Sequence, residues 1–227
     1  MAEADITIPE HIPELKHHFD DSAQQLESST LGMWVFLLTE IMFFGGMFGS
    51  YTVYRNLYPA AFASTSHFMN VTLGGINTSV LIGSSLTMAL AVRAAQLGAK
   101  KALIIFLILT LILGSVFLGI KYLEYHEKWV DHHIPGPGFR YAEPQFFHQA
   151  QILFFLYFAM TGMHAMHMIV GVGLLTTLIV MAARNRFNAE WYTPVEMIGL
   201  YWHFVDIVWI FLFPLLYLIG HTNGPAT

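Results

Sequence analysis

Long apolar stretches separated by short polar segments dominate this chain. A helix needs about 20 apolar residues to cross roughly 30 Å of hydrocarbon. Five stretches reach that length, and they cover residues 31–54, 71–95, 102–122, 146–183 and 195–219. The fourth is long enough to tilt or to project beyond the lipid. The pattern predicts an all-α protein, an integral membrane bundle of five transmembrane helices.

Polar and turn-forming residues mark the expected helix boundaries. Residues 1–30 are polar and acidic, so we expect an N-terminal arm followed by a membrane domain at residues 31–222. Hydroxyl side chains at residues 28–30 are candidate N-caps for the first helix. Thr193-Pro194-Val195-Glu196 combines a cap, a proline and a capping-box glutamate, which predicts the start of the fifth helix. Gly98 is expected to end the second helix in a left-handed conformation.

Small residues four apart predict where helices approach each other. Gly45 and Gly49 lie on the first span, and Ser115 and Gly119 lie on the third. This spacing lets membrane helices pack closely, although glycine is also a common background residue in apolar helices. We therefore expect helix contacts at these two positions.

Composition narrows the class of protein further. The chain is 56% hydrophobic and 11% charged, whereas charged residues make up about 25% of an ordinary soluble domain. No basic segment precedes an early apolar run, so no cleavable signal peptide is expected. The arm is too acidic for a nucleic-acid tail. Because cysteine is absent, disulfides and thiolate-held metal sites are excluded.

Lysine and arginine in the short loops predict the orientation. Cytoplasmic loops of membrane proteins carry an excess of these residues. The loops after the second and fourth spans hold Arg93, Lys100, Lys101, Arg184 and Arg186. The opposite side holds Arg55, Lys121, Lys128 and Arg140, the last three in a longer acid-rich segment. We expect a cytoplasmic N-terminus and a periplasmic C-terminus.

Two acids stand in the middle of apolar spans. Counting about 1.5 Å per residue from the cytoplasmic helix starts places Glu40 roughly 14 Å deep and Asp206 roughly 17 Å deep. An ionisable group at such depth costs roughly 3 kcal/mol or more unless it is neutral, paired or beside an internal cavity. We interpret Glu40 as a buried, proton-exchanging acid. Asp206 is either a similar group or a hydrogen-bonded lock between helices.

Three histidines accompany these acids. His164 and His167 share one face of the fourth helix, and His203 lies one turn before Asp206. They are candidate haem or metal ligands, or hydrogen-bonding support for the acids. We expect support, with a hydrogen bond between His203 and Asp206, and no metal site. No nucleotide-binding, zinc-protease or nucleophile motif is present, so we expect no catalytic residue in this chain.

Five segments, in order, resemble the signature segments of subunit III of haem-copper terminal oxidases. They are Thr39–Phe44, Ile76–Leu81, Leu123–Tyr125, Thr161–His167 and Tyr201–Asp206. The resemblance covers nearly all of the membrane part. The mitochondrial form has two further helices before the segment that matches Leu31. This chain is therefore similar to the shorter five-helix form of bacterial quinol oxidases and some bacterial cytochrome c oxidases.

The resemblance implies a non-catalytic core subunit of a respiratory complex in the bacterial inner membrane. Such a subunit packs against subunit I, where electrons from cytochrome c or quinol reduce dioxygen to water while protons are pumped. It binds no haem or copper itself, supports the stability and proton uptake of subunit I, and holds structural phospholipid. We expect the first, third and fourth helices to contact subunit I. Other oxidase subunits, lipids and a respiratory supercomplex are the expected partners, and nucleic acid is not.

The resemblance also implies roles for single residues. Glu40 matches the family's carbodiimide-reactive acid, and His167 matches a histidine close to it. Arg184 and Arg186 lie near the family's basic contacts to lipid head groups, and both also fit the positive-inside pattern. Two alternatives stay open at this point. One is a haem-binding membrane anchor or electron-transfer subunit that uses His164 or His167 with His203. The other is an accessory subunit of a nitric-oxide reductase.

Overall fold

The computed structural model describes residues 19–66, 69–141, 143–187 and 191–218, and this part of the chain is helical with no strand. The helices are α1 (Ser22–Leu57), α2 (Pro59–Ser66), α3 (Val71–Gln96), α4 (Lys100–Val130), α5 (Phe147–Ala183) and α6 (Thr193–Phe213). A 3₁₀ turn, η1 (Pro144–Phe146), precedes α5, and a π-helical segment, η2 (Pro214–Leu218), follows α6. The short helix α2 was not predicted.

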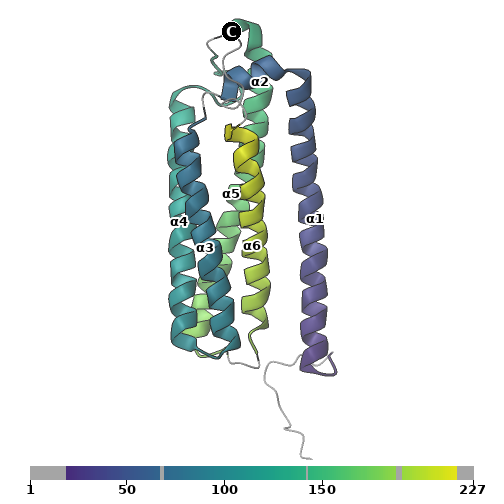
Figure 1. The fold of residues 1–227 in the computed structure, drawn as a ribbon, viewed down its shortest axis with the longest axis vertical. Helices are drawn as coiled ribbons and strands as arrows, with labels where there is room; N and C mark the ends of the chain where they lie inside the picture. The colour runs from purple at the N-terminus through teal and green to yellow at the C-terminus, as the bar shows by residue number, and fades with distance from the viewer. Residues whose placement is uncertain (1–18, 67–68, 142, 188–190, 219–227) are drawn as a thin grey trace, which may run out of the picture.

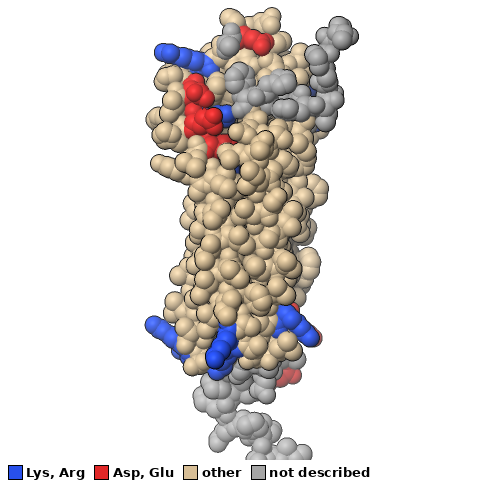
Figure 2. Space-filling model, turned by 60° about the vertical axis from the view of Figure 1, so that its left-hand side comes forward, with Lys and Arg blue, Asp and Glu red and all other residues tan. Residues whose placement is uncertain are grey.

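Five of these helices are long and apolar enough to cross a membrane within the described residues, as the sequence predicted. α3, α4, α5 and α6 form a bundle, α1 runs alongside it, and α2 lies across one end (Figure 1). Charged side chains gather at the two ends of the molecule, and the middle of the face in Figure 2 carries none. This distribution is that of a protein whose apolar girdle faces lipid.

Helix α1 begins well before the expected first span. The Asp21 side chain accepts a 2.7 Å hydrogen bond from the backbone N–H of Gln24 and so caps the helix. The expected caps at residues 28–30 are wrong, because these residues already lie inside α1. The last part of the expected arm therefore belongs to the first helix, and residues 1–18 of that arm lie outside the described residues.

The end of α3 and the start of α6 test two further boundary predictions. Gly98 ends α3 with a φ of 65°, as predicted. Thr193 is the first residue of α6 instead of its cap, and no side chain caps this helix. The backbone carbonyl of Tyr192 accepts from Val195 and Glu196 in place of a side chain.

Close packing surrounds Trp202, whose side chain is fully buried. A Cβ atom on Gly114 of α4 would lie 2.6 Å from the Trp202 ring, and one on Gly171 of α5 would lie 2.9 Å from it. Only glycine leaves room for the indole at these two places. The contacts expected at Gly45–Gly49 and Ser115–Gly119 are wrong for the described chain, since a Cβ on any of those glycines would meet nothing within 4 Å.

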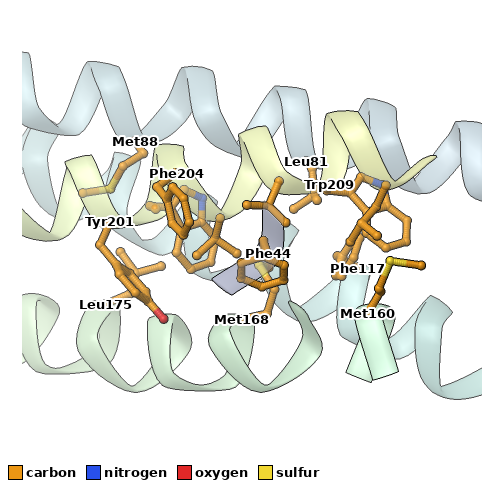
Figure 3. Packing of buried hydrophobic residues seen from close by; sticks show 14 of the residues in the cluster. Phe44, Leu81, Met88, Phe117, Met160, Met168, Leu175, Tyr201, Phe204 and Trp209 are labelled. Atoms are coloured by element: carbon orange, nitrogen blue, oxygen red, sulfur yellow. The ribbon is translucent and has the colours of Figure 1, made fainter. Parts of the chain in front are cut away.

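Helix α1 contacts the bundle mainly through α6 and α5. Phe44 is one of its buried anchors: the residue is 2% exposed, and its ring lies 5.4 Å from the His167 ring and 6.3 Å from the Phe204 ring. Figure 3 shows Phe44 among the core side chains of α5 and α6. Between α1 and α6 a cavity of about 500 Å³ remains, lined by apolar side chains and by His203.

Candidate functional site

Glu40 of α1 and His167 of α5 meet inside the apolar part of the molecule. The Nε2 atom of His167 lies 3.1 Å from Oε2 of Glu40. The His167 side chain is 11% exposed and the Glu40 side chain is 19% exposed, so the contact lies at the edge of the packed core. Sequence reasoning singled out both residues and expected them to be close, and the fold brings them together.

The remaining contacts of His167 fix its role in this pair. Its Nδ1 lies 2.8 Å from the backbone carbonyl of Met163, which only accepts, so Nδ1 carries a proton and donates. In the neutral ring Nε2 then accepts, and it does so from a protonated Glu40. In the charged ring Nε2 donates to an ionised Glu40. The pair can therefore exist in two forms that differ by the position of one proton along a single hydrogen bond.

His203 and Asp206 do not form the expected hydrogen bond. His203 turns toward α3, where its Nδ1 lies 2.8 Å from the Ser85 hydroxyl. Asp206 is 2% exposed, and within the described residues neither of its carboxyl oxygens has a hydrogen-bond partner. Residues three apart share one helix face, and both side chains line the same pocket as Ser85, but His203 pairs with the Ser85 hydroxyl instead of the carboxyl group.

His164 is fully buried and stands apart from both acids. Its ring lies 5.3 Å from the Phe117 ring and 5.0 Å from the Trp209 ring, and within the described residues neither nitrogen has a hydrogen-bond partner. The support that the sequence predicted for this residue is therefore not formed. His164, His167 and His203 each face a different neighbour, so they do not present paired ligands to a haem.

A buried ion pair that sequence reasoning missed lies on α4. Lys121 and Glu124 are 3% and 2% exposed, and Lys121 Nζ lies 2.8 Å from Glu124 Oε2. Lys121 also donates to the Tyr217 hydroxyl at 2.8 Å, and Tyr157 donates to Glu124 Oε1 at 2.7 Å. The ammonium lies 4.7 Å from the Trp209 ring. The ammonium, the carboxylate and both tyrosine hydroxyls of this cluster each take part in a hydrogen bond.

The assignment of Lys121 to the exterior loop charges is wrong, because Lys121 lies within α4. α4 continues to Val130, and the buried face of its second half carries Gly114, Phe117, Lys121, Glu124 and Lys128. That spacing of three and four is the signature of one helix face. Following the face beyond the apolar span would have located the pair.

The two candidate lipid contacts, Arg184 and Arg186, are exposed directly after α5. Between them Asn185 adopts a φ of 56°, and its side chain accepts a 3.1 Å hydrogen bond from Lys100. The turn therefore presents both guanidinium groups beside the basic start of α4. Among the residues that the structure describes, no group of three histidine or acidic side chains could hold a metal ion.

Comparison with known proteins shows the family of this chain. Residues 16–221 match the sequence family described as cytochrome c oxidase subunit III. Subunit 3 of the cytochrome bo(3) ubiquinol oxidase of Pseudomonas aeruginosa is 31% identical over 91% of this chain and 92% of its own length. Cytochrome c oxidase subunit 3 of Alkalihalophilus pseudofirmus is 28% identical over 91% of this chain and 94% of its own.

Quinol oxidase subunit 3 of Bacillus subtilis is also 28% identical, over 90% of this chain and 96% of its own length. The names of these relatives indicate different electron donors, yet all three are similar to this chain to about the same degree. Together with the five membrane helices, these matches indicate a multi-pass protein of the bacterial plasma membrane. The chain belongs to the family of subunit III of haem-copper oxidases.

Proposed function

We propose that this chain is a non-catalytic subunit III that stabilises a respiratory oxidase and supports proton uptake by its catalytic neighbour, subunit I. In that complex dioxygen is reduced to water with electrons from cytochrome c or quinol, and protons are pumped. Haem and copper belong to the partner subunits. The N-terminus faces the cytoplasm, and Arg184 and Arg186 hold phospholipid head groups.

The contact between Glu40 and His167 carries this proposal. It lies in the apolar part of the bundle, where an ionisable side chain is costly unless it is paired or functional. It also links α1 to α5 through a polar contact. The same contact therefore attaches α1 to the bundle and provides two groups between which a proton can move.

The location of this pair suits an accessory role. Both side chains remain partly exposed at the edge of the core, so a neighbouring subunit or water can reach them. Helix α1 presents a largely apolar outer surface, with Leu38, Ile41 and Met42 more than half exposed. A partner subunit that covers this surface would place the pair at the interface. α4 and α5 remain the other expected contacts.

Replacing Glu40 by alanine in the assembled oxidase tests the proposal. Oxygen consumption should be largely unchanged in a short assay, while activity should decay faster during prolonged turnover. Glu40→Gln is the matched variant, because it keeps the hydrogen bond but cannot exchange the proton. If endurance depends on helix attachment, glutamine restores it; if it depends on proton exchange, glutamine resembles alanine.

Immediate loss of turnover in correctly assembled Glu40→Ala enzyme would contradict an accessory role. If both variants keep normal activity and normal endurance, the function proposed for the contact between Glu40 and His167 is wrong. Spectra of the assembled complex, which report the partner's haems, provide the check on assembly.

A further inference from the structure

A second cavity, the α3–α6 pocket, opens on the outer surface of the bundle. Its volume is about 250 Å³. The polar side is formed by Ser85, His203 and Asp206, and the rim by Ile82, Ile207 and Ile210. The three isoleucines are 54%, 50% and 46% exposed, so they face the surroundings of the bundle. The pocket therefore has a polar floor, formed by Ser85, His203 and Asp206, and an apolar mouth, formed by the three isoleucines.

Asp206 gives the pocket its chemistry. The side chain is 2% exposed, lines the cavity and has no hydrogen-bond partner for either oxygen within the described residues. The Ser85 hydroxyl lines the same pocket, but its hydrogen bond goes to His203. A carboxyl group accepts hydrogen bonds in either protonation state. The floor therefore offers free acceptor atoms to a ligand that donates a hydrogen bond.

The depth of the pocket limits what can reach it. Asp206 lies about 20 Å along the membrane span that begins at Thr193 and ends at Leu218, at 1.5 Å per residue. That position is near the middle of the hydrocarbon layer, whereas phospholipid head groups lie at its two surfaces. A ligand must carry its donor on an otherwise apolar body.

The larger cavity between α1 and α6 adds a second constraint. It shares His203 and Ile207 with the α3–α6 pocket, and its lining is almost entirely apolar. The two cavities flank the exposed edge of α6 on opposite sides. A compact polar ring with a flexible apolar tail can fill the pocket and cross Ile207 into the cavity.

We propose that the α3–α6 pocket binds a membrane-soluble molecule with a hydroxyl-bearing ring, such as a phenol, and an apolar tail. The ring hydroxyl donates to Asp206, beside Ser85 and His203. The tail crosses the edge of α6 at Ile207 toward the cavity between α1 and α6. This site is separate from the contact between Glu40 and His167, so it does not depend on the function proposed for that pair.

Photolabelling of the complex in its native membrane tests the site. The probe is a 4-alkylphenol with a diazirine in its alkyl chain, and the control probe is its methyl ether, which cannot donate. The phenol should label α6 and α1 near Ile207 roughly tenfold more than the ether, the effect of one lost hydrogen bond to a carboxyl group. Equal labelling by both probes would overturn the proposal, and so would labelling of a neighbouring subunit alone.

Variants of the pocket provide the second arm. Asp206→Leu keeps a similar volume and removes the acceptor, so it should abolish the preference for the phenol. Ile210→Trp narrows the mouth without touching a polar group, and it should reduce labelling even if Asp206→Leu does not assemble. Leu86→Trp is the matched control, since Leu86 is 62% exposed on α3 and does not line the pocket. Undiminished labelling of Ile210→Trp would overturn the site.

Discussion

Oε2 of Glu40 lies 3.1 Å from Nε2 of His167, so a carboxyl group from α1 meets an imidazole from α5. The two residues are far apart in sequence, and their contact joins α1, which runs alongside the bundle, to α5 within it. Because Phe44 packs against the same imidazole, one short segment of α1 supplies both the polar and the apolar parts of its attachment.

The attachment predicts a measurable coupling between Glu40 and His167. Removing either partner leaves the other without its hydrogen bond, which should cost about 1–3 kcal/mol. The double variant Glu40→Ala/His167→Ala should lose less than the sum of the single losses. Thermal release of the subunit from the detergent-solubilised oxidase measures this. Additive losses would mean that the contact contributes nothing to attachment.

The cluster around Lys121 predicts a different pattern. Lys121→Met leaves Glu124 as an uncompensated buried charge, and this should destabilise the bundle by about 3–5 kcal/mol. The double variant Lys121→Met/Glu124→Met removes both charges and should recover much of that loss. The fraction of chain that stays folded in detergent at increasing temperature provides the measurement. A double variant weaker than both single variants would contradict the pairing.

Trp202 predicts strict size limits at two glycines. A methyl group on Gly114 or Gly171 would collide with the indole, so each alanine variant should lose about 1–3 kcal/mol through overpacking. Gly173→Ala is the control on the same helix, because a Cβ there would meet nothing within 4 Å. Thermal unfolding followed by Trp fluorescence compares them. Equal behaviour of all three variants would show that the indole moves aside.

His133, in the loop after α4, predicts a pH dependence outside the membrane. Burial, followed by the nearby Lys128 ammonium, holds the pKa of His133 below its usual value, and Asp131 opposes this weakly. The folded state then binds fewer protons than the unfolded state, so stability rises with pH. The contribution is present above the usual histidine pKa of about 6.5 and is lost on acidification below it.

Hydrogen exchange of the loop at residues 131–141 provides the measurement for His133. Its protection should fall as the pH drops below about 6.5, because the ring then gains a charge in a partly buried place near the Lys128 ammonium. The ring stacks on Phe154, with 5.0 Å between ring centroids. His133→Phe keeps the stacking and cannot titrate, so its protection should be flat over the same range. An identical pH response in this variant would assign the effect to another group.

The sequence by itself determined the number and approximate position of the membrane helices. Apolar runs are local properties, and a bilayer forces each run into a helix because backbone groups find no water there. The left-handed Gly98 was predictable for the same reason, since φ above zero is a property of a single residue. Glu40 and Asp206 were recognisable because an acid within such a run is conspicuous.

Only the tertiary structure decided which polar groups meet. His203 could have turned toward Asp206 on its own helix, but the rotation of α6 against α3 directs it to Ser85. Lys121 and Glu124 looked like charges at the end of a span until the packing of α5 and η2 enclosed them with Tyr157 and Tyr217. A hydrogen bond between helices depends on their relative rotation and depth, and a hydropathy pattern contains no information about either.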